Sequence, residues 1–450
     1  MKYSAAMVMA SAAAVSADCS ITSFLENGNW YCEAVQLISY AGLDTSGSYK
    51  AVSNMDTTTG DCTFESQTYS GSIAPFNEEL SVHIRGPTQL KQFAVYTPNT
   101  ASTKKRSEHK SHVHKRHGHQ HLHKKHTEAQ KEEARAVGDV VTAVIDGQTV
   151  SWVNTWSGES DDSADSASAA TTTAAATSTT SKAKSSKTSA TSTGTAAAAT
   201  GDYQRIAYYN AEDGTADGVT FVGAWGGVAG SGTWDTKFGN SLSYLSADGT
   251  TGAESSTVLD NVLVGDNIEY AIFSDVECTA DDADCGYYRP DSVAYQGFGG
   301  ADKVFLFEFT MPLSGSSEGT NPDMPAIWLL NGKIPRTQQY GDCSCWATDS
   351  DSDGCGEADL FEVLSQGDTK AKSTFHFLNS LGSSDYFDRP TEDYIKIAAV
   401  FRASDSTASI KILDSSVDFS SSLTSDTVDG FITETDSLLS AIMDFVSSLK

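Results

Sequence analysis

The sequence predicts an all-β protein, with a two-sheet sandwich in the C-terminal half and a smaller β module in the N-terminal part. Beyond Thr200, short strand-like runs such as 304–309 and 395–413 are separated by Gly, Asp and Ser turns, without a long helical period. The N-terminal part has similar runs, at 80–85 and 92–96, around a Gly-Pro turn. This pattern favours packed sheets over helices.

Charge and length limit the kinds of protein that the chain can be. It has 450 residues, with 30 Lys and Arg against 59 Asp and Glu, which gives a net charge of −29. Such an acidic surface repels nucleic acid, so we expect no nucleic-acid partner. No run of about 18 consecutive apolar residues occurs, which excludes a membrane-spanning helix, and we expect a monomer without a membrane partner.

Residues 1–17 predict a secretory signal peptide, because a lysine is followed by an apolar stretch (5–15) and by small residues up to Ala17. A buried N-terminal helix is the alternative. At the other end, acidic residues interrupt the apolar residues of the tail 431–450, which is unlike a lipid-anchor signal. We therefore expect a secreted, extracellular protein.

Composition divides the rest of the chain into segments. An Asp-Gly pair within alternating apolar and polar residues predicts a β-hairpin, and a long stretch of Ser, Thr and Ala predicts a disordered linker. We expect, in order, an N-terminal β module (18–103), a basic His-rich loop with dibasic sites (104–135), the hairpin that completes the module (136–156), the linker (157–200), the sandwich (201–430) and a C-terminal tail (431–450).

The basic loop holds eight of the ten histidines. Three interpretations stay open: a loose zinc- or copper-binding tract, a solvated polycationic loop that contacts acidic wall polymers, and a site of cleavage by secretory processing proteases. Most of the histidines alternate without carboxylate or cysteine partners, so their spacing fixes no metal geometry.

The eight cysteines predict disulfides, as expected in an oxidising compartment. They form an N-terminal group of three and a C-terminal group of five: Cys19, Cys32 and Cys62, then Cys278, Cys285, Cys343, Cys345 and Cys355. Because both numbers are odd, either one bridge joins the two halves or each half keeps a free thiol. The pairing cannot be read from the sequence.

The candidate catalytic residues lie in the run Glu-Ala-Asp-Leu-Phe-Glu-Val at 357–363. In a strand, side chains two apart share a face, so Glu357 and Asp359 point the same way. Glu362 would face the opposite side of a regular strand. One β-bulge between Asp359 and Glu362 would turn it back, and bulges are frequent beside active sites.

Three acids crowded on one face would repel one another, which separates their pKa values. A retaining glycosidase needs this, because one carboxylate attacks while another carboxyl donates a proton, about 5–5.5 Å away. A surface strand with scattered acids is the alternative. Trp328, Tyr340 and Trp346 lie nearby in the sequence and offer flat rings on which sugars could stack.

At this point the chain resembles a known family. The segments Pro-Ala-Ile-Trp-Leu-Leu (325–330), Gly-Glu-Ala-Asp-Leu-Phe-Glu (356–362) and Ser-Thr-Phe-His (373–376) are similar to the core of glycoside hydrolase family 16. That family has a β-jelly-roll fold and contains endo-β-1,3-glucanases and cell-wall transglycosylases. The whole arrangement is similar to fungal secreted cell-wall proteins described as glucan endo-1,3-β-D-glucosidases.

The resemblance implies a role for each matching residue. Glu357 corresponds to the nucleophile, Glu362 to the general acid/base, and Asp359 to the helper that orients the nucleophile. His376 corresponds to a histidine near the acid/base, hydrogen-bonded to the helper or to substrate. Trp328 corresponds to a position under the sugar-binding cleft, although it fits a core position equally well.

The loop before the acids departs from the family pattern. It carries two cysteines and an Asp-x-Asp-x-Asp-Gly run at 349–354, whereas family members have a short aromatic connection. A calcium loop would need a bidentate Glu at its twelfth position, where this chain has Leu360. We therefore predict a solvated loop held by a disulfide through Cys355, and assign no metal and no cofactor.

The sequence thus predicts a secreted cell-wall glycoside hydrolase that cleaves β-1,3-glucan internally, with β-glucan as its partner. Two alternatives remain. A transglycosylase would pass the covalent intermediate to another sugar instead of water. A non-catalytic wall protein would only bind glucan in its cleft. The role of the N-terminal module stays open.

Overall fold

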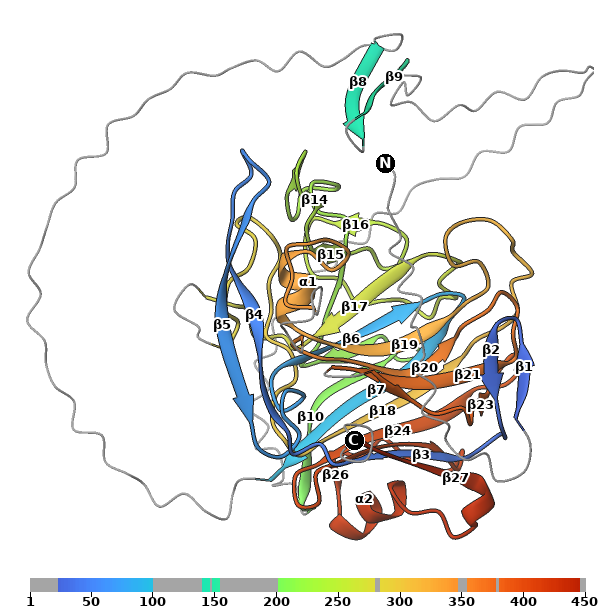
Figure 1. Ribbon diagram of the computed structural model, residues 1–450. Coiled ribbons are helices and arrows are strands. Elements are labelled where there is room, and N and C mark those ends of the chain that lie inside the picture. Colours follow the sequence, from blue (N-terminus) through green and yellow to red (C-terminus); the bar gives the residue numbers. More distant parts are fainter. Residues whose placement is uncertain are drawn as a thin grey trace, which may run out of the picture. The chain divides into compact units, whose positions relative to one another are not determined.

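The structure is a computed structural model, shown in Figure 1. It describes residues 23–99, 140–145, 148–153, 201–279, 284–346, 354–377 and 380–445. The chain forms two compact units: Met1–Lys104 together with Ala197–Lys450, and Lys105–Ala196. The predicted signal peptide, basic His-rich loop and linker lie outside the described residues.

Strands make up nearly all of the regular structure, so the predicted all-β class is confirmed. The described helices are short: α1 (Lys333–Thr337), α2 (Ser425–Phe431) and one 3₁₀ turn (Ser437–Leu439). None of these is long and apolar enough to cross a bilayer.

The first unit is built around two large sheets, which confirms the predicted sandwich. One sheet has the order β11 (Thr215–Asp217), β10 (Tyr203–Asn210), β7 (Gln89–Pro98), β18 (Lys303–Thr310), β24 (Ile395–Arg402), β25 (Thr407–Leu413), β3 (Leu37–Ala41) and β27 (Ser440–Asp444), with β26 (Ser422–Leu423) beside β10. All of its pairs are antiparallel except β3 with β27.

The other sheet carries the candidate site. Its order is β16 (Gly252–Ala253), β15 (Ser243–Leu245), β12 (Thr220–Gly223), β17 (Glu269–Phe273), β6 (Leu80–Arg85), β19 (Ala326–Asn331), β20 (Glu357–Val363), β21 (Lys370–His376) and β22 (Leu381–Gly382), with β23 (Phe387–Asp388) beside β21. We call this the site sheet.

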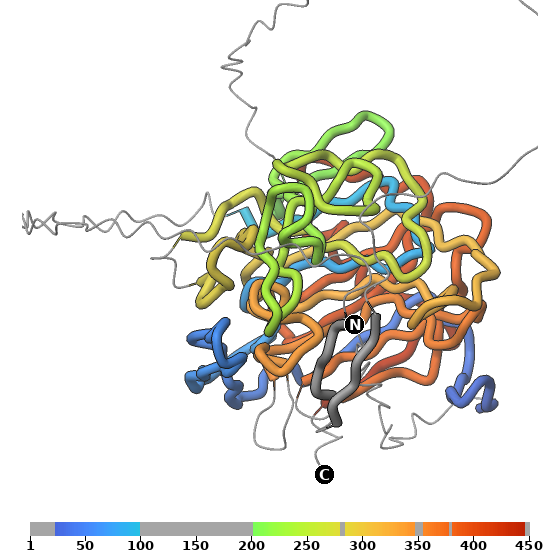
Figure 2. Tube along the Cα trace, turned by 90° about the horizontal axis from the view of Figure 1, so that it is seen from above, coloured from blue at the N-terminus to red at the C-terminus, as the bar shows by residue number. Residues whose placement is uncertain are grey.

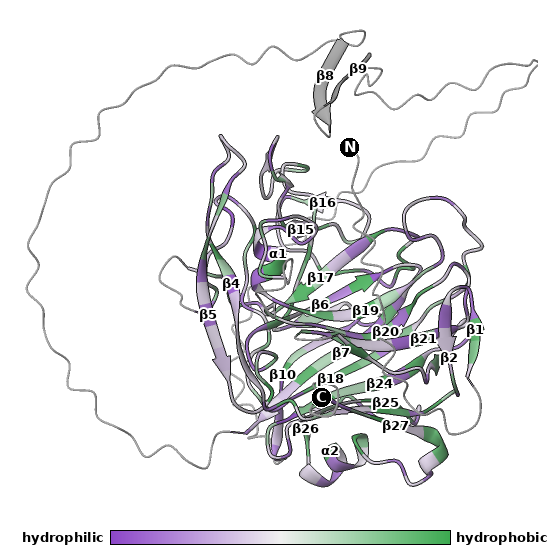
Figure 3. Cartoon of the chain, viewed as in Figure 1, coloured by the Kyte–Doolittle hydropathy of each residue, from purple (hydrophilic) through white to green (hydrophobic). Residues whose placement is uncertain are grey.

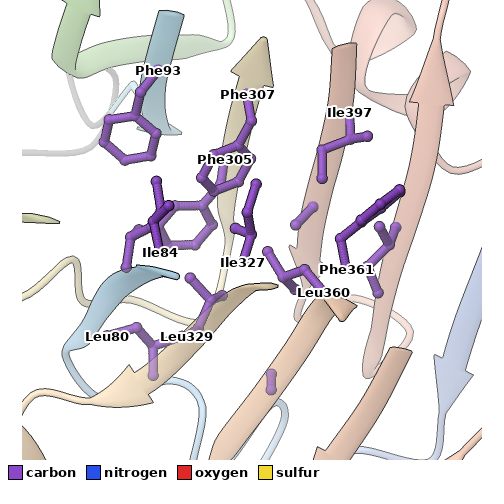
Figure 4. Close-up of a cluster of buried hydrophobic side chains, with 14 of the residues drawn as sticks. Leu80, Ile84, Phe93, Phe305, Phe307, Ile327, Leu329, Leu360, Phe361 and Ile397 are labelled. Carbon is purple, nitrogen blue, oxygen red and sulfur yellow. The ribbon is translucent and has the colours of Figure 1, made fainter. Parts of the chain in front are cut away.

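The core lies between the two sheets. Alternate side chains of facing strands interdigitate there, and Figure 4 shows Phe305 and Phe307 of β18 close to Ile327 of β19. Every residue of β18 is buried, because α2 and its flanking loops pack on the outer face of that sheet. Figure 3 shows the contrast between the apolar strands of the sandwich and the polar strand β5. Burial of each large apolar side chain contributes about 1.5–3 kcal/mol.

The N-terminal part contributes strands to both sheets. β6 lies between β17 and β19, β7 between β10 and β18, and β3 between β25 and β27. Figure 2 shows N-terminal segments in blue running among orange C-terminal ones. The sequence pattern could not reveal this, because alternation defines a strand but not a partner that lies hundreds of residues away.

The same part adds two-stranded elements of its own. These are β1 (Phe24–Glu26) with β2 (Asn29–Tyr31), and the long hairpin of β4 (Ser46–Met55) with β5 (Cys62–Ser70). The hairpin predicted at 136–156 is present as β8 (Val140–Ile145) and β9 (Gln148–Val153). It lies in the second unit and forms a two-stranded sheet of its own.

β7 is the last described strand before the second unit in the sequence, and β10 is the first one after it. They pair directly, with Pro98 opposite Tyr203, and the amide of Asn99 donates to the carbonyl of Asp202 at 2.7 Å. The second unit is therefore inserted at the tip of a hairpin of the first unit.

The disulfides resolve the odd numbers of cysteines in the two halves. Cys62, beside the tip of the β4–β5 hairpin, bonds Cys343, so one bridge does join the halves. The other two bridges are Cys278–Cys285 and Cys345–Cys355. Cys32 is also disulfide-bonded, and none of the described cysteines is free.

We expect the double variant Cys62→Ser/Cys343→Ser to lower the free energy of unfolding by about 2–4 kcal/mol, because the bridge restricts the unfolded chain over a separation of 281 residues. Denaturant unfolding of the variant and the wild type measures this. The matched control is Cys278→Ser/Cys285→Ser, whose bridge closes a separation of only 7 residues and should cost less. Equal losses in the two variants would contradict the prediction.

Candidate active site

The bulge predicted in the acidic strand is present in β20. Asp359 pairs with Thr374 of β21 and Glu362 with Lys372, so β20 has one extra residue between the two acids. Leu360 and Phe361 both lie in the core between the sheets. With two consecutive side chains on the core face, the alternation resets and Glu362 returns to the face of Asp359.

Glu357, Asp359 and Glu362 therefore lie on the outer face of the site sheet, each in its own row of cross-strand neighbours. The row of Glu357 contains Ser81, Leu330 and His376. Directly paired residues on neighbouring strands have Cβ atoms about 4.5–5.5 Å apart, so each acid lies within reach of its row.

The middle row explains where Trp328 lies. It pairs with Asp359 on one side and with His83 on the other. Trp328 is only 4% exposed, and its ring lies 5.3 Å from the His83 ring. Trp328 lies in a buried cluster with Leu330 and Ile334, on the same face of the site sheet as Asp359. Burial lowers the pKa of His83 to about 3, so this imidazole is neutral.

The third row consists of Glu269, Arg85, Ala326, Glu362 and Lys372, in that order across five strands. Arg85 donates from Nη2 to Oε1 of Glu362 at 3.2 Å, and its Nη1 lies 3.8 Å from Oε1 of Glu269. The carboxyl of Glu362 thus has a buried cation as its immediate neighbour.

His376 and Trp346 complete the site around the first two acids. Nε2 of His376 lies 2.9 Å from Oδ2 of Asp359, and its Nδ1 lies 3.0 Å from the hydroxyl of Ser380. Nε1 of Trp346 donates to Oε2 of Glu357. The two rings are 6.3 Å apart. Both residues predicted as substrate-binding therefore also contact the acids.

Tyr340 stands at the rim of the site. Its side chain is 68% exposed, and its hydroxyl donates to Oε2 of Glu269 at 2.5 Å. An exposed aromatic ring fixed by its hydroxyl is suited to stacking against a sugar. It makes no hydrogen bond that the structure shows to the three acids of β20.

Two disulfides hold the loop that carries Trp346. Cys345 is bonded to Cys355, as predicted for the loop, and Cys343 to Cys62 of the β4–β5 hairpin. The calcium-like run at 349–354 lies outside the described residues except for its last glycine. Within the described part of the chain, no group of three or more His, Cys, Asp or Glu is placed to hold a metal ion.

The electrostatics favour protons on the two glutamates. Burial raises the pKa of Glu357 and of Glu362, and the negative charge of Asp359 raises both further. The bond from Trp346 counteracts this at Glu357, as does Arg85 at Glu362, because each stabilises the ionised form.

His376 responds in the opposite sense. Burial lowers its pKa, but the hydrogen bond to Asp359 and the charges of the three acids outweigh this and raise it to about 9. The imidazole is therefore protonated below that pH, and it forms an ion pair with Asp359. The site as a whole holds acids and cations side by side, and the side chains of Glu362 and His376 are 23% and 16% exposed.

Sequence reasoning missed Arg85, Glu269 and His83. The available signal was the run 80–85, in which Ser, His and Arg alternate with Leu, Val and Ile. That alternation shows a polar face of a strand. It does not show that the polar face adjoins residues 357–362.

The fold and the site define a β-sandwich protein with a carboxylate cluster of the residue types that retaining glycosidases use. Residues 201–431 match the family described as cell wall protein YJL171C/Tos1, C-terminal, and residues 36–98 match its N-terminal counterpart. The chain therefore belongs to the Tos1/YJL171C family of cell wall proteins. In the sequence, one matched region precedes the second unit and the other follows it.

Curated relatives match along nearly the whole chain. The chain is 44% identical over 443 residues to "Probable circularly permuted 1,3-beta-glucanase TOS1" of Saccharomyces cerevisiae, covering 94% of each protein. It is 39% identical to the protein of the same name in Candida albicans, covering 97% of this chain and 99% of the relative. A relative in Arthroderma benhamiae is 40% identical, with 92% of each covered. No solved structure matches the chain.

Proposed function

We propose that this protein is a secreted cell-wall glycoside hydrolase that cleaves β-1,3-glucan internally with retention of configuration. The observation that carries the proposal is the bulge of β20, which brings Glu357, Asp359 and Glu362 onto one face. The printed names of the relatives, probable circularly permuted 1,3-beta-glucanases, support the choice of substrate. The family name supports the cell wall as its location.

In the first step, Glu362 donates its proton to the leaving oxygen while the Glu357 carboxylate attacks the anomeric carbon. The glycosidic bond breaks, and a covalent ester between the sugar and Glu357 forms. In the second step, Glu362 takes a proton from water, and that water displaces Glu357 from the sugar. The proton removed from the water restores the acid form of Glu362.

Burial and the charge of Asp359 raise the pKa of both glutamates, so Glu357 must lose its proton before it can attack. The hydrogen bond that Trp346 donates to Glu357 favours this ionised form. Burial and the charge of Asp359 favour the protonated form of Glu362. His376 contacts Asp359, which holds the carboxyl of Asp359 in place between the two glutamates of the strand.

The circular permutation in the relatives' names also suits this chain. β3, β6 and β7 precede the second unit in sequence and yet pair with strands that follow it. We infer that this chain shares the permuted order, with strands of its sandwich supplied from both sides of the insertion.

The stereochemistry of the product tests the proposal. With a β-1,3-glucan oligosaccharide followed by proton NMR, we expect the β-anomer to appear first and internal bonds to be cleaved. Longer products from a labelled acceptor would point instead to a transglycosylase. An α-anomer would contradict retention, and glucan binding without turnover would leave a non-catalytic wall protein.

A further inference from the structure

Arg85 has an unusual position for an arginine. It is only 8% exposed and lies between two acids, with Glu362 on one side and Glu269 on the other. Its Nε donates to the carbonyl of Met324 at 2.7 Å, which fixes the plane of the guanidinium. A buried cation of this kind is costly unless its partners are well placed, so its location calls for an explanation.

Ala326 explains how Arg85 reaches Glu362. Arg85 lies on β6 and Glu362 on β20, and Ala326 occupies the position between them on β19. Its methyl group leaves open the space that a larger side chain would fill. The guanidinium crosses this space, 5.8 Å from the ring of the buried Trp328.

We propose that Arg85 is a positioning residue for Glu362, which it holds in place across Ala326, and that Glu269 tunes this hold by competing for the same guanidinium. Tyr340 in turn holds Glu269 through its hydroxyl. This inference rests on the proposed role of Glu362 as acid/base. It assigns a task to residues of β6 and β17, which come from opposite sides of the second unit in sequence.

Charged and titratable groups surround Glu362 on every side. They are Arg85 on β6, Glu269 on β17, Glu357 and Asp359 on its own strand, Lys372 and His376 on β21, and Tyr340 on the rim loop. Arg85 and His376 favour the ionised form of Glu362, while burial and Asp359 favour the protonated form. Loss of Arg85 removes one of these cations and leaves the opposing effects in place.

The sign of the effect follows directly. A carboxyl group that loses a neighbouring cation keeps its proton to a higher pH. Arg85→Met should therefore move the basic limb of the pH profile of kcat/KM to higher pH, by about one pH unit or more. Glu269→Gln should move the basic limb to lower pH, because Arg85 then no longer shares its charge between Glu269 and Glu362. The glutamine side chain keeps an oxygen for the Tyr340 hydroxyl, so the rim contact survives this substitution.

The experiment measures this limb for the wild type, Arg85→Met, Arg85→Lys and Glu269→Gln on one β-1,3-glucan oligosaccharide. Arg85→Lys keeps the positive charge, so its basic limb should lie close to that of the wild type. Arg402→Met is the matched control, because Arg402 lies on β24 of the other sheet and pairs with Asp405 and Asp429, and it should leave the limb unmoved. Shifts of opposite sign in the Arg85 and Glu269 variants exclude a merely structural effect.

A second readout separates this inference from the proposed function. Carbon-13 NMR of labelled glutamate follows the carboxyl of Glu362, assigned from the signal that Glu362→Gln lacks, without any turnover. If the wild type is inactive on glucan, the proposed function fails. A higher pKa of the Glu362 carboxyl in Arg85→Met would still support the inference that Arg85 positions Glu362. If neither the limb nor the titration moves, the inference is overturned.

Discussion

Glu357→Gln is expected to abolish turnover, with release of reducing sugar from a β-1,3-glucan falling by about 1,000-fold or more, because no covalent intermediate can form. Glu362→Gln is expected to lose about 100- to 10,000-fold, since proton donation is lost while the nucleophile remains. Glutamine keeps the shape of glutamate and an oxygen that can accept from Trp346 or Arg85, so both variants should fold.

The two roles can be separated by the leaving group. An aryl glycoside with an acidic phenol needs no proton, so Glu362→Gln should recover the first step on such a substrate, whereas Glu357→Gln should not. Glu212→Gln is the matched control, because that side chain is 59% exposed and pairs with Lys91 on the other sheet. Wild-type rates in either site variant would rule out the assigned mechanism.

Trp346→Phe is expected to lower kcat by about 10- to 100-fold, the effect of removing one hydrogen bond to a charged group. The indole donates to Glu357, and without it the carboxylate loses a partner that stabilises its ionised form. The pKa of Glu357 should therefore rise, and the acidic limb of the pH profile of kcat/KM should move to higher pH.

Trp234→Phe is the control for this change, because Trp234 on β13 (Trp234–Asp235) is 52% exposed. It should leave both limbs and kcat unchanged. If Trp346 served only as a platform for sugar stacking, phenylalanine would keep much of its contribution, KM would change more than kcat, and the acidic limb would not move. That pattern would refute the role assigned to the indole nitrogen.

Local features of the site could be predicted from the sequence because they depend on neighbours in the chain. The spacing of Glu357, Asp359 and Glu362 required a bulge, and β20 has one. A disulfide through Cys355 was expected to hold the preceding loop, and Cys345–Cys355 is that bridge.

Features that depend on strand order could not be predicted. Arg85 precedes Glu362 by 277 residues, and no local pattern connects the two. The N-terminal strands β6 and β7 could be recognised as strands, but their partners in the two sheets are a property of the whole fold. Alternation likewise could not decide whether Trp328 is buried, because both faces of the site sheet carry apolar residues around it.

The pairing of Pro98 with Tyr203 has a further consequence. Because the main chain leaves and re-enters the sandwich at adjacent points, a turn of a few residues would be long enough to close it there. The intervening segment is thus free to lengthen, shorten or be exchanged among descendants while the glutamates of β20 keep their surroundings. Such an arrangement lets the length of the inserted segment change without altering the two sheets of the sandwich.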